Sequence, residues 1–188
     1  MRIMLVGDVV GRAGRRAFRT LTPRLRAERG VDVVIVNGEN SAGGKGYTRK
    51  SLDELYAGGA DIVTSGNHVW DKKDVFAFID DEPFLIRPAN YPEGTPGRGY
   101  CIFPFKAVNI AVLNLSGRSF MPALDCPFQK ADEVLAEIEG RADIIVLDFH
   151  AETTSEKLAM GHYLDGRADI VVGTHTHVQT ADAQILPG

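Results

Sequence analysis

The sequence predicts an α/β fold, and three observations in its 188 residues carry this prediction. Short apolar runs recur along the chain, and each of them ends at a carboxylate, an asparagine or a histidine. Segments with apolar residues at helical spacing separate most of these runs. In the middle of the chain two apolar runs follow each other directly, as in a β-hairpin. The hairpin breaks the alternation of strand and helix, so we expect a mixed or a second sheet.

The apolar pattern in the first half of the chain predicts three strand–helix units. We expect strands within residues 2–6, 29–36 and 58–65, and helices at residues 14–28, 51–56 and 72–79. Pro23 lies inside the first helix and predicts a kink or a break there, because proline lacks the N–H group that a helix needs. Thr48 is expected to cap the second helix, with Leu52, Leu55 and Tyr56 facing inward.

The second half begins with a short strand within residues 84–90 and continues with the hairpin, whose strands 100–105 and 108–115 are joined by Lys106-Ala107. A long loop at 116–127 precedes a helix at 128–138, a strand at 143–149, a helix at 155–164 and a strand at 168–172. Gln184-Ile185-Leu186 has the pattern of a beginning strand. We therefore expect one domain over residues 1–188, without the C-terminal strands of a longer protein.

Composition and charge exclude several classes of protein. The net charge of −4 argues against a broad nucleic-acid-binding surface, although a local basic patch stays open. The chain starts without the features of a signal peptide, and no apolar run approaches the ~18 residues of a membrane span. The two cysteines do not form a disulfide framework, so a cytoplasmic protein with no membrane partner is expected.

The polar residues that end the strands form the candidate site. In α/β sheets ligands bind beyond the carboxyl ends of the strands, so these side chains are expected at one edge. Residues i and i+2 of an extended segment point to the same side, which allows two imidazoles after the last strand to meet one metal ion. The residues concerned are Asp8, Glu39, Asn67, His150, His175 and His177.

Each of these residues also has a simpler interpretation. Asp8 could cap the first helix, Asn67 could make a turn, and a single histidine at a strand end is often a hydrogen-bonded core residue. His162, within a predicted helix, is interpreted as structural. The arginines near the first turn predict a solvated helix face, with a phosphate contact by Arg12 or Arg15 as the alternative. The glycines after the first strand do not have dinucleotide-binding spacing.

Several motifs together resemble the calcineurin-like metallophosphoesterase superfamily and, within it, the bacterial YmdB-like family of 2′,3′-cyclic-nucleotide phosphodiesterases. The resemblance covers nearly the whole chain and implies a sandwich of two packed mixed β-sheets flanked by helices. The superfamily usually has a histidine at Val10 and an aspartate at Glu39, so Asn40 is expected to replace the missing histidine as a ligand. The motifs that carry the resemblance are Gly7–Gly11, Asn37–Asn40, Gly66–Trp70, Asp148–Lys157 and Gly173–His177.

The resemblance also implies the site's chemistry. Glu39 would bridge two metal ions, iron or manganese, because a carboxylate has two oxygens and the ligand set contains no thiolate. Cations ~3.5–4 Å apart can hold a hydroxide and clamp a phosphate for in-line attack. His68, next to a ligand, is the candidate general acid. The ligands would be Asp8, Asn40 and His177 for the first ion, and Asn67, His150 and His175 for the second.

The sequence therefore predicts an enzyme, a dinuclear metal-dependent phosphoester hydrolase. The chemistry of the residues leads to a phosphoester hydrolase, and the resemblance adds the 2′,3′-cyclic nucleotide as a small-molecule substrate. A broader phosphomonoesterase or nuclease on the same site is the alternative within enzymes. A metal- or nucleotide-binding regulator with little turnover is the alternative outside them. The physiological substrate, the native metal, the pathway and the oligomeric state, including a homo-oligomer, stay open.

Overall fold

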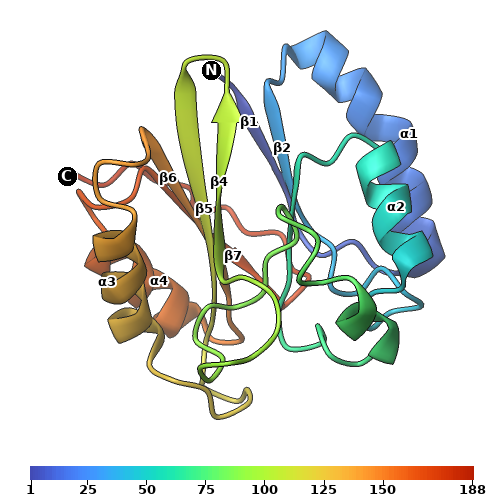
Figure 1. Ribbon diagram of the computed structural model, residues 1–188. Helices are drawn as coiled ribbons and strands as arrows, with labels where there is room; N and C mark the ends of the chain where they lie inside the picture. The colour runs from blue at the N-terminus through green and yellow to red at the C-terminus, as the bar shows by residue number, and fades with distance from the viewer. The chain divides into compact units, whose positions relative to one another are not determined.

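A computed structural model describes residues 1–188, and its chain divides into two compact units (Figure 1). Unit 1 comprises Met1–Arg87 with Pro96–Arg98, and unit 2 comprises Pro88–Thr95 with Gly99–Gly188. Each unit contains one β-sheet and its own helices. None of the helices has the length and apolar character that crossing a membrane requires.

Unit 1 is built on a three-stranded parallel sheet in the order β1-β2-β3. The central strand is buried over its whole length, which explains its continuous apolar sequence. The 3-10 helix η1 is shorter than the helix predicted at residues 72–79. The elements are β1 (Ile3–Val6), α1 (Gly11–Arg29), β2 (Val33–Asn37), α2 (Arg49–Ala57), β3 (Ile62–Thr64) and η1 (Lys73–Ala77).

Helix α1 runs unbroken through Pro23, so of the two predicted outcomes the break is wrong, and the kink stays a prediction. Pro23 is exposed, and water can therefore satisfy the carbonyl group that has lost its helical N–H partner. The helix ends at Arg29 and is capped by Gly30, whose φ of 61° lies in the left-handed region that glycine adopts most easily. The side chain of Phe18 packs against Gly58, just beyond α2, where a Cβ atom would lie 2.8 Å from the ring.

The predicted cap of α2 is confirmed. The side chain of Thr48 accepts a hydrogen bond from the backbone N–H of Ser51, and the Ser51 hydroxyl in turn accepts from the Thr48 N–H. This reciprocal pair satisfies two helix-end donors. Leu52 and Leu55 are fully buried as expected, whereas Tyr56 is only half-buried.

Unit 2 has a mixed sheet in the order β4-β5-β6-β7, in which only the β4–β5 pair is antiparallel. The predicted hairpin is confirmed with its connection at Lys106-Ala107. Helices α3 and α4 cover one face of this sheet (Figure 1). Val134 of α3 and Met160 of α4 belong to the same buried cluster as Leu147 and Phe149 of the sheet. The elements are β4 (Tyr100–Phe105), β5 (Val108–Ser116), α3 (Pro127–Glu137), β6 (Ile144–His150), α4 (Thr154–Tyr163) and β7 (Ile170–Thr174).

The predicted α/β fold with two sheets and flanking helices is confirmed. Only the sheet of unit 2 is mixed, since the strands of unit 1 are all parallel. The strand expected within residues 84–90 is reduced to two isolated bridges, Val63–Leu85 and Ile86–Arg98. Residues 184–186 form no strand, because no neighbouring strand pairs with their backbone.

Arg15 of α1 forms an ion pair with Glu54 of α2. Its Nε donates to the Glu54 carboxylate at 2.7 Å, and its guanidinium also donates to the Ser41 carbonyl oxygen. This hydrogen bond from Arg15 holds the pKa of Glu54 below its ordinary value. The arginine is thus engaged in a structural contact and does not present its charge to a phosphate, in contrast to the alternative raised for it.

The lowered pKa of Glu54 predicts a pH-dependent contribution to stability. A carboxyl group with a depressed folded-state pKa stabilises the fold above its unfolded-state pKa and loses this effect as the pH falls through the folded value. We expect Glu54→Gln to lower the melting temperature at pH 7, and the difference from the parent protein to shrink below about pH 4. Glu28→Gln, which removes the exposed partner of Arg24, should change little at either pH. A Glu54→Gln difference of equal size at pH 3 and pH 7 would contradict this account.

Candidate metal centre

In unit 1 the carboxyl ends of three parallel strands bring the predicted oxygen ligands to one edge. Asp8 follows β1, Glu39 and Asn40 follow β2, and Asn67 follows β3. Backbone hydrogen bonds join the first two turns, since Val9 N–H donates to the Asn37 carbonyl at 2.9 Å and Gly11 N–H to the Asn40 carbonyl at 2.8 Å. The turns that carry Asp8 and Asn40 are therefore held side by side.

Glu39 is a buried carboxylate, with 1% of its surface exposed. One of its oxygens, Oε2, accepts the backbone N–H of His68 at 2.9 Å, and its own N–H donates to the Asn37 side chain at 3.2 Å. Gly38 before it leaves no space for a side chain, because a Cβ atom there would lie 2.5 Å from Leu55. The tight turn and the Asn37 amide therefore fix the position of the Glu39 carboxylate.

Asn40 has a buried amide oxygen that accepts no hydrogen bond. Its Nδ2 donates to the Gly44 carbonyl at 3.0 Å, which orients the amide and leaves Oδ1 turned away from that contact. Buried polar atoms almost always have partners, so an unsatisfied carbonyl oxygen needs an explanation. A hard cation, which prefers oxygen ligands, would satisfy it. Asn40 thus fits the predicted role of a metal ligand.

Asp8 does not cap helix α1, so this simpler interpretation is wrong. The N-cap position belongs to Val10, and no side chain accepts a hydrogen bond there. One carboxylate oxygen of Asp8 is buried instead at the end of β1. A charged group in this position is consistent with the predicted ligand role, because Asp8 does not occupy the N-cap of the helix.

His68 lies in the turn after β3 with about a quarter of its side chain exposed. Its Nδ1 pairs with the Asp71 carboxylate at 2.9 Å. A carboxylate on one ring nitrogen fixes the orientation of the imidazole and favours the tautomer with a proton on that nitrogen. This arrangement leaves Nε2 as the nitrogen that can exchange a proton with a substrate.

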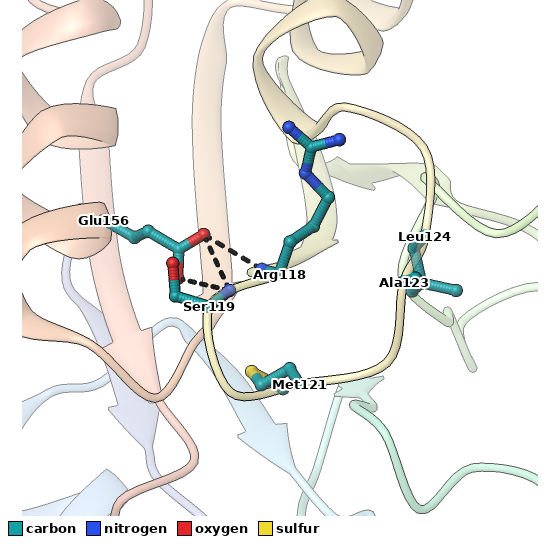
Figure 2. Close-up of a pocket in the computed structure, with 6 residues that line it drawn as sticks. All are labelled: Arg118, Ser119, Met121, Ala123, Leu124 and Glu156. Atoms are coloured by element: carbon teal, nitrogen blue, oxygen red, sulfur yellow. Dashed lines mark hydrogen bonds between the residues drawn. The ribbon is translucent and has the colours of Figure 1, made fainter.

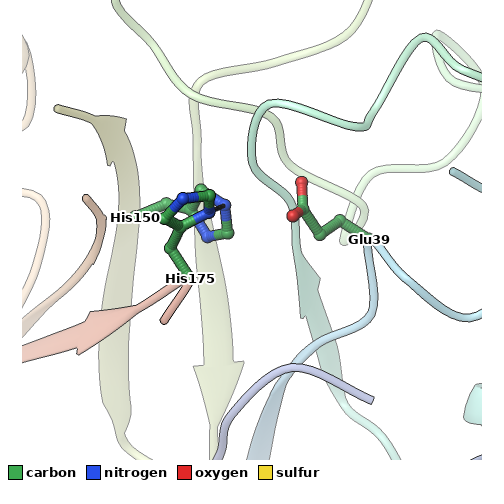
Figure 3. Close-up of side chains that lie close together, drawn as sticks. All are labelled: Glu39, His150 and His175. Carbon is green, nitrogen blue, oxygen red and sulfur yellow. Dashed lines mark hydrogen bonds between the residues drawn. The ribbon is translucent and has the colours of Figure 1, made fainter. Parts of the chain in front are cut away.

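In unit 2 the last residue of β6 and the first residue after β7 bring two imidazoles together. His150 is fully buried, and its Nε2 lies 3.1 Å from Nδ1 of His175 (Figure 3). The rings meet edge to face with centroids 4.8 Å apart. Two nitrogens bound to one metal ion at about 2.1 Å would be separated by about 3.0–3.4 Å. The pair therefore has the spacing of two ligands of one ion.

The other nitrogen of each imidazole is linked to a carboxylate, through a hydroxyl group in His150 and directly in His175. Nδ1 of His150 lies 2.9 Å from the Thr174 hydroxyl, which donates to Asp148 at 2.8 Å. Nε2 of His175 pairs directly with Glu152 at 2.9 Å. Metal-binding histidines characteristically have such outer partners, which fix the tautomer and the ring orientation. Both imidazoles therefore direct their remaining nitrogen toward the other ring.

His175 and His177 do not lie in an extended segment, so this part of the prediction is wrong. Strand β7 ends at Thr174, and the two histidines have φ angles of 98° and 55°. Non-glycine residues rarely adopt such angles, and they occur most often at functional sites. His175 reaches His150 through this turn, and His177 is exposed two residues later. The assignment of His177 as a metal ligand stays a prediction.

Sequence reasoning missed the residues that support the site. Three of them contact a predicted site residue directly, and the fourth, Asp148, reaches His150 through the Thr174 hydroxyl. The four residues are Asn37, Asp148, Glu152 and Thr174. Asp148 could have been found from its place two residues before His150, because alternate residues of a strand share a face. The contacts of Asn37 and Glu152 depend on turns, and the contact of Thr174 depends on the register of β6 and β7. The sequence pattern contains neither.

Comparison with known proteins identifies the family. The model of a family described as YmdB-like protein matches residues 4–188. The chain belongs to the YmdB-like family. A Bacillus subtilis (strain 168) relative, described as 2′,3′-cyclic-nucleotide 2′-phosphodiesterase, is 56% identical over 187 residues, which cover 100% of this chain and 71% of the relative. The predicted family is thus confirmed, and so is the prediction that the protein is an enzyme.

Two solved structures of relatives share the fold. A hypothetical protein from Thermus thermophilus has a TM-score of 0.94 and 45% identity, covering 100% of this chain and 72% of that one. A protein from Mycoplasma pneumoniae, described as a novel phosphatase, has a TM-score of 0.92 and 36% identity, with 98% of this chain and 67% of that one covered. These similarities support the two-sheet architecture that carries the YmdB-like motifs.

The Thr174 hydroxyl offers a direct test of the outer contacts in unit 2. Thr174→Val keeps the side-chain shape but removes the link between His150 and Asp148, so the imidazole should lose its fixed tautomer. Loss of such outer contacts typically weakens metal binding about 10–100-fold, and we expect a decrease of that size. Competition with a chromogenic chelator measures it without an activity assay. Thr176→Val, in the same turn, is the matched control. Equal metal affinity in both variants and the parent would show that the hydroxyl does not support a ligand.

Proposed function

We propose that this protein is a metal-dependent phosphodiesterase that hydrolyses 2′,3′-cyclic nucleotides. The observation that carries the proposal is the 56% identity, over the whole chain, with a Bacillus subtilis enzyme described by that activity. The strand-end residues provide a chemical basis, since carboxylate, amide and imidazole groups gather at the sheet edges of both units.

The proposed ligand set, within a single metallophosphoesterase domain, is Asp8, Glu39, Asn40, Asn67, His150, His175 and His177. Oxygen and imidazole ligands without thiolates suit iron or manganese. Such ions, when bound, supply positive charge to the phosphate and lower the pKa of a water molecule. The unsatisfied Asn40 oxygen and the spacing of the two imidazoles support this fit. Elemental analysis of protein purified without chelator would identify the metal.

His68 is proposed to protonate the leaving ribose oxygen. Its Nδ1 is held by Asp71, so the ring, when it is protonated on both nitrogens, can present the Nε2 proton in a fixed direction. Its backbone N–H donates to the Glu39 carboxylate. This hydrogen bond fixes the turn that contains His68 next to the proposed bridging ligand. The neighbouring Asn67 is the proposed ligand, and His68 itself is not needed for metal binding.

A broader phosphomonoesterase or nuclease is the second candidate. It is favoured by the description of the Mycoplasma pneumoniae relative as a phosphatase. Parallel rates on 2′,3′-cyclic nucleotides, p-nitrophenyl phosphate and RNA would separate these activities. Absence of hydrolysis of every phosphoester, with Mn²⁺ added, would instead favour a metal- or nucleotide-binding regulator.

Changing the proposed bridging carboxylate should remove metal. Glu39→Gln keeps the side-chain shape but removes the negative charge that two cations would share. We expect loss of one or both ions and a loss of activity, measured by elemental analysis and by hydrolysis of a cyclic nucleotide. Glu54→Gln, on helix α2, is the control for a carboxylate outside the strand ends and should keep the metal. Two tightly bound ions in Glu39→Gln would exclude a bridging role for Glu39.

The role of His68 is tested with substrates that differ in their leaving group. General acid catalysis contributes about 10²–10⁴-fold, so His68→Ala should slow hydrolysis of a cyclic phosphodiester by roughly that factor while metal content stays near normal. The loss should be smaller with a p-nitrophenolate leaving group, which scarcely needs protonation. An equal loss on all substrates would refute the acid role, and a loss of metal would make His68 a ligand.

A further inference from the structure

The loop 117–126 of unit 2 begins beside the imidazole pair. It leaves the carboxyl end of β5, where Ser116 pairs in register with His150, and Gly117 N–H donates to the His150 carbonyl at 2.9 Å. Gly117 has no space for a side chain, because a Cβ atom would lie 2.7 Å from Ala151. A ligand held at the end of β6 would therefore have this loop as its neighbour within the unit.

Asn90 ties the two ends of the loop together. Its side chain accepts the Ser116 N–H at 2.9 Å and donates to the carbonyl groups of Ser116 and Asp125 at 2.9 and 3.0 Å. Its backbone carbonyl accepts the Asp125 N–H at 3.1 Å. Because Asn90 is fully buried, these contacts are shielded from competing water. The ends of the loop are thus fixed by one residue.

Glu156 holds the first part of the loop. Its carboxylate accepts the backbone N–H groups of Arg118, at 2.9 Å, and of Ser119, at 3.2 and 3.3 Å (Figure 2). The same carboxylate accepts the Thr153 hydroxyl at 3.0 Å at the start of α4. Hydrogen bonds to a charged group are stronger than neutral ones. The loop is therefore a preformed structure attached to α4.

The loop curves around a pocket of about 380 Å³ (Figure 2). This volume lies within the range of small-molecule sites, which are mostly apolar with a few polar groups. Met121, Ala123 and Leu124 provide the apolar wall, and Arg118, Ser119 and Glu156 provide the polar part. A flat heterocycle with apolar faces and polar edges matches such a lining.

Phe120, between the lining residues Ser119 and Met121, is almost completely exposed. Its exposed fraction is 92%, so it contributes nothing to the core of the unit. Its φ of 59° lies in the left-handed region, which is unfavourable for a bulky residue. The core of the unit therefore does not require this backbone conformation. Both features are expected if the ring serves a ligand.

We propose that the loop 117–126 binds the nucleobase of the substrate, with the ring of Phe120 stacked on the base and Met121 and Leu124 contacting its apolar surface. Ser119, which lines the pocket, would supply a hydroxyl group for the polar edge of the base. Stacking tolerates different bases because every base has a π-face, so this subsite selects nucleotides as a class. The proposal rests on the proposed function, because it names the part of that substrate that lies beyond the phosphate.

Nucleoside binding tests the loop independently of hydrolysis. Adenosine and uridine carry a base but no phosphate, and their dissociation constants can be measured by calorimetry on the intact protein. We expect Phe120→Ala to weaken binding about 5–150-fold, the effect typical of losing one base–aromatic stack. Phe120→Trp should keep the affinity because it keeps a stacking ring. Ile185→Ala, which removes another exposed apolar side chain, should have no effect.

The kinetic counterpart separates this proposal from the proposed function. Phe120→Ala should raise KM for 2′,3′-cyclic AMP with little change in kcat, and should leave hydrolysis of methyl ribofuranoside 2′,3′-cyclic phosphate, which has no base, unchanged. Unchanged nucleoside binding in Phe120→Ala would overturn the base subsite, even if the protein hydrolyses both substrates. Absence of hydrolysis by the parent protein would overturn the proposed function, while the nucleoside measurement would still decide on the loop.

Discussion

The backbone pairing of β6 with its two parallel neighbours is the constraint on which the chemistry of unit 2 depends. This register places Ser116, His150 and Thr174 in one row across β5, β6 and β7. A shift by one residue would turn each side chain to the opposite face of the sheet. The register therefore fixes at once the buried imidazole, the hydroxyl that orients it and the start of the loop 117–126.

Buried amide side chains make the turns at these strand ends rigid. Asn37 donates to the Ser65 carbonyl at 3.1 Å and accepts from Glu39, and Asn90 joins both ends of the loop in unit 2. Each amide supplies donors and an acceptor to backbone groups that turns leave unpaired. Leaving such groups unpaired would cost ~1–3 kcal/mol each. Against this background the unsatisfied oxygen of Asn40 is exceptional, which is why it carries weight as a ligand candidate.

The strand ends could be predicted from the sequence because their signal is local. An apolar run followed by a polar residue defines a strand and its last side chain, and the pattern located the turns of Asp8, Glu39 and Asn67 correctly. The cap by Thr48 is equally local. The conformation of His175 could not be predicted, because alternation along the sequence does not reveal where pairing with β6 ends.

Contacts between distant residues account for most of the rest. Arg15 pairs with a carboxylate 39 positions away, and Glu156 holds backbone groups 37 and 38 positions away. Neither partner can be identified from spacing, because both depend on how the helices pack on their sheets. The role of Asn90 could not be predicted for the same reason, because its partners Ser116 and Asp125 are distant in the sequence. It is one of the few fully buried polar residues.

The two kinds of element in unit 2 differ in how freely they can change. His150 cannot move without changing the register of β6. Its partner Thr174 lies opposite it on β7, and Asp148 lies two residues earlier on β6 itself. The loop 117–126 is fixed only at its ends and by Glu156, so its exposed residues can vary without disturbing the sheet. Strand ends are thus suited to chemistry that must stay constant, and the loop is suited to determining which molecule carries the phosphate. A rigid sheet with a separately anchored loop allows selectivity to change while the imidazole geometry is preserved.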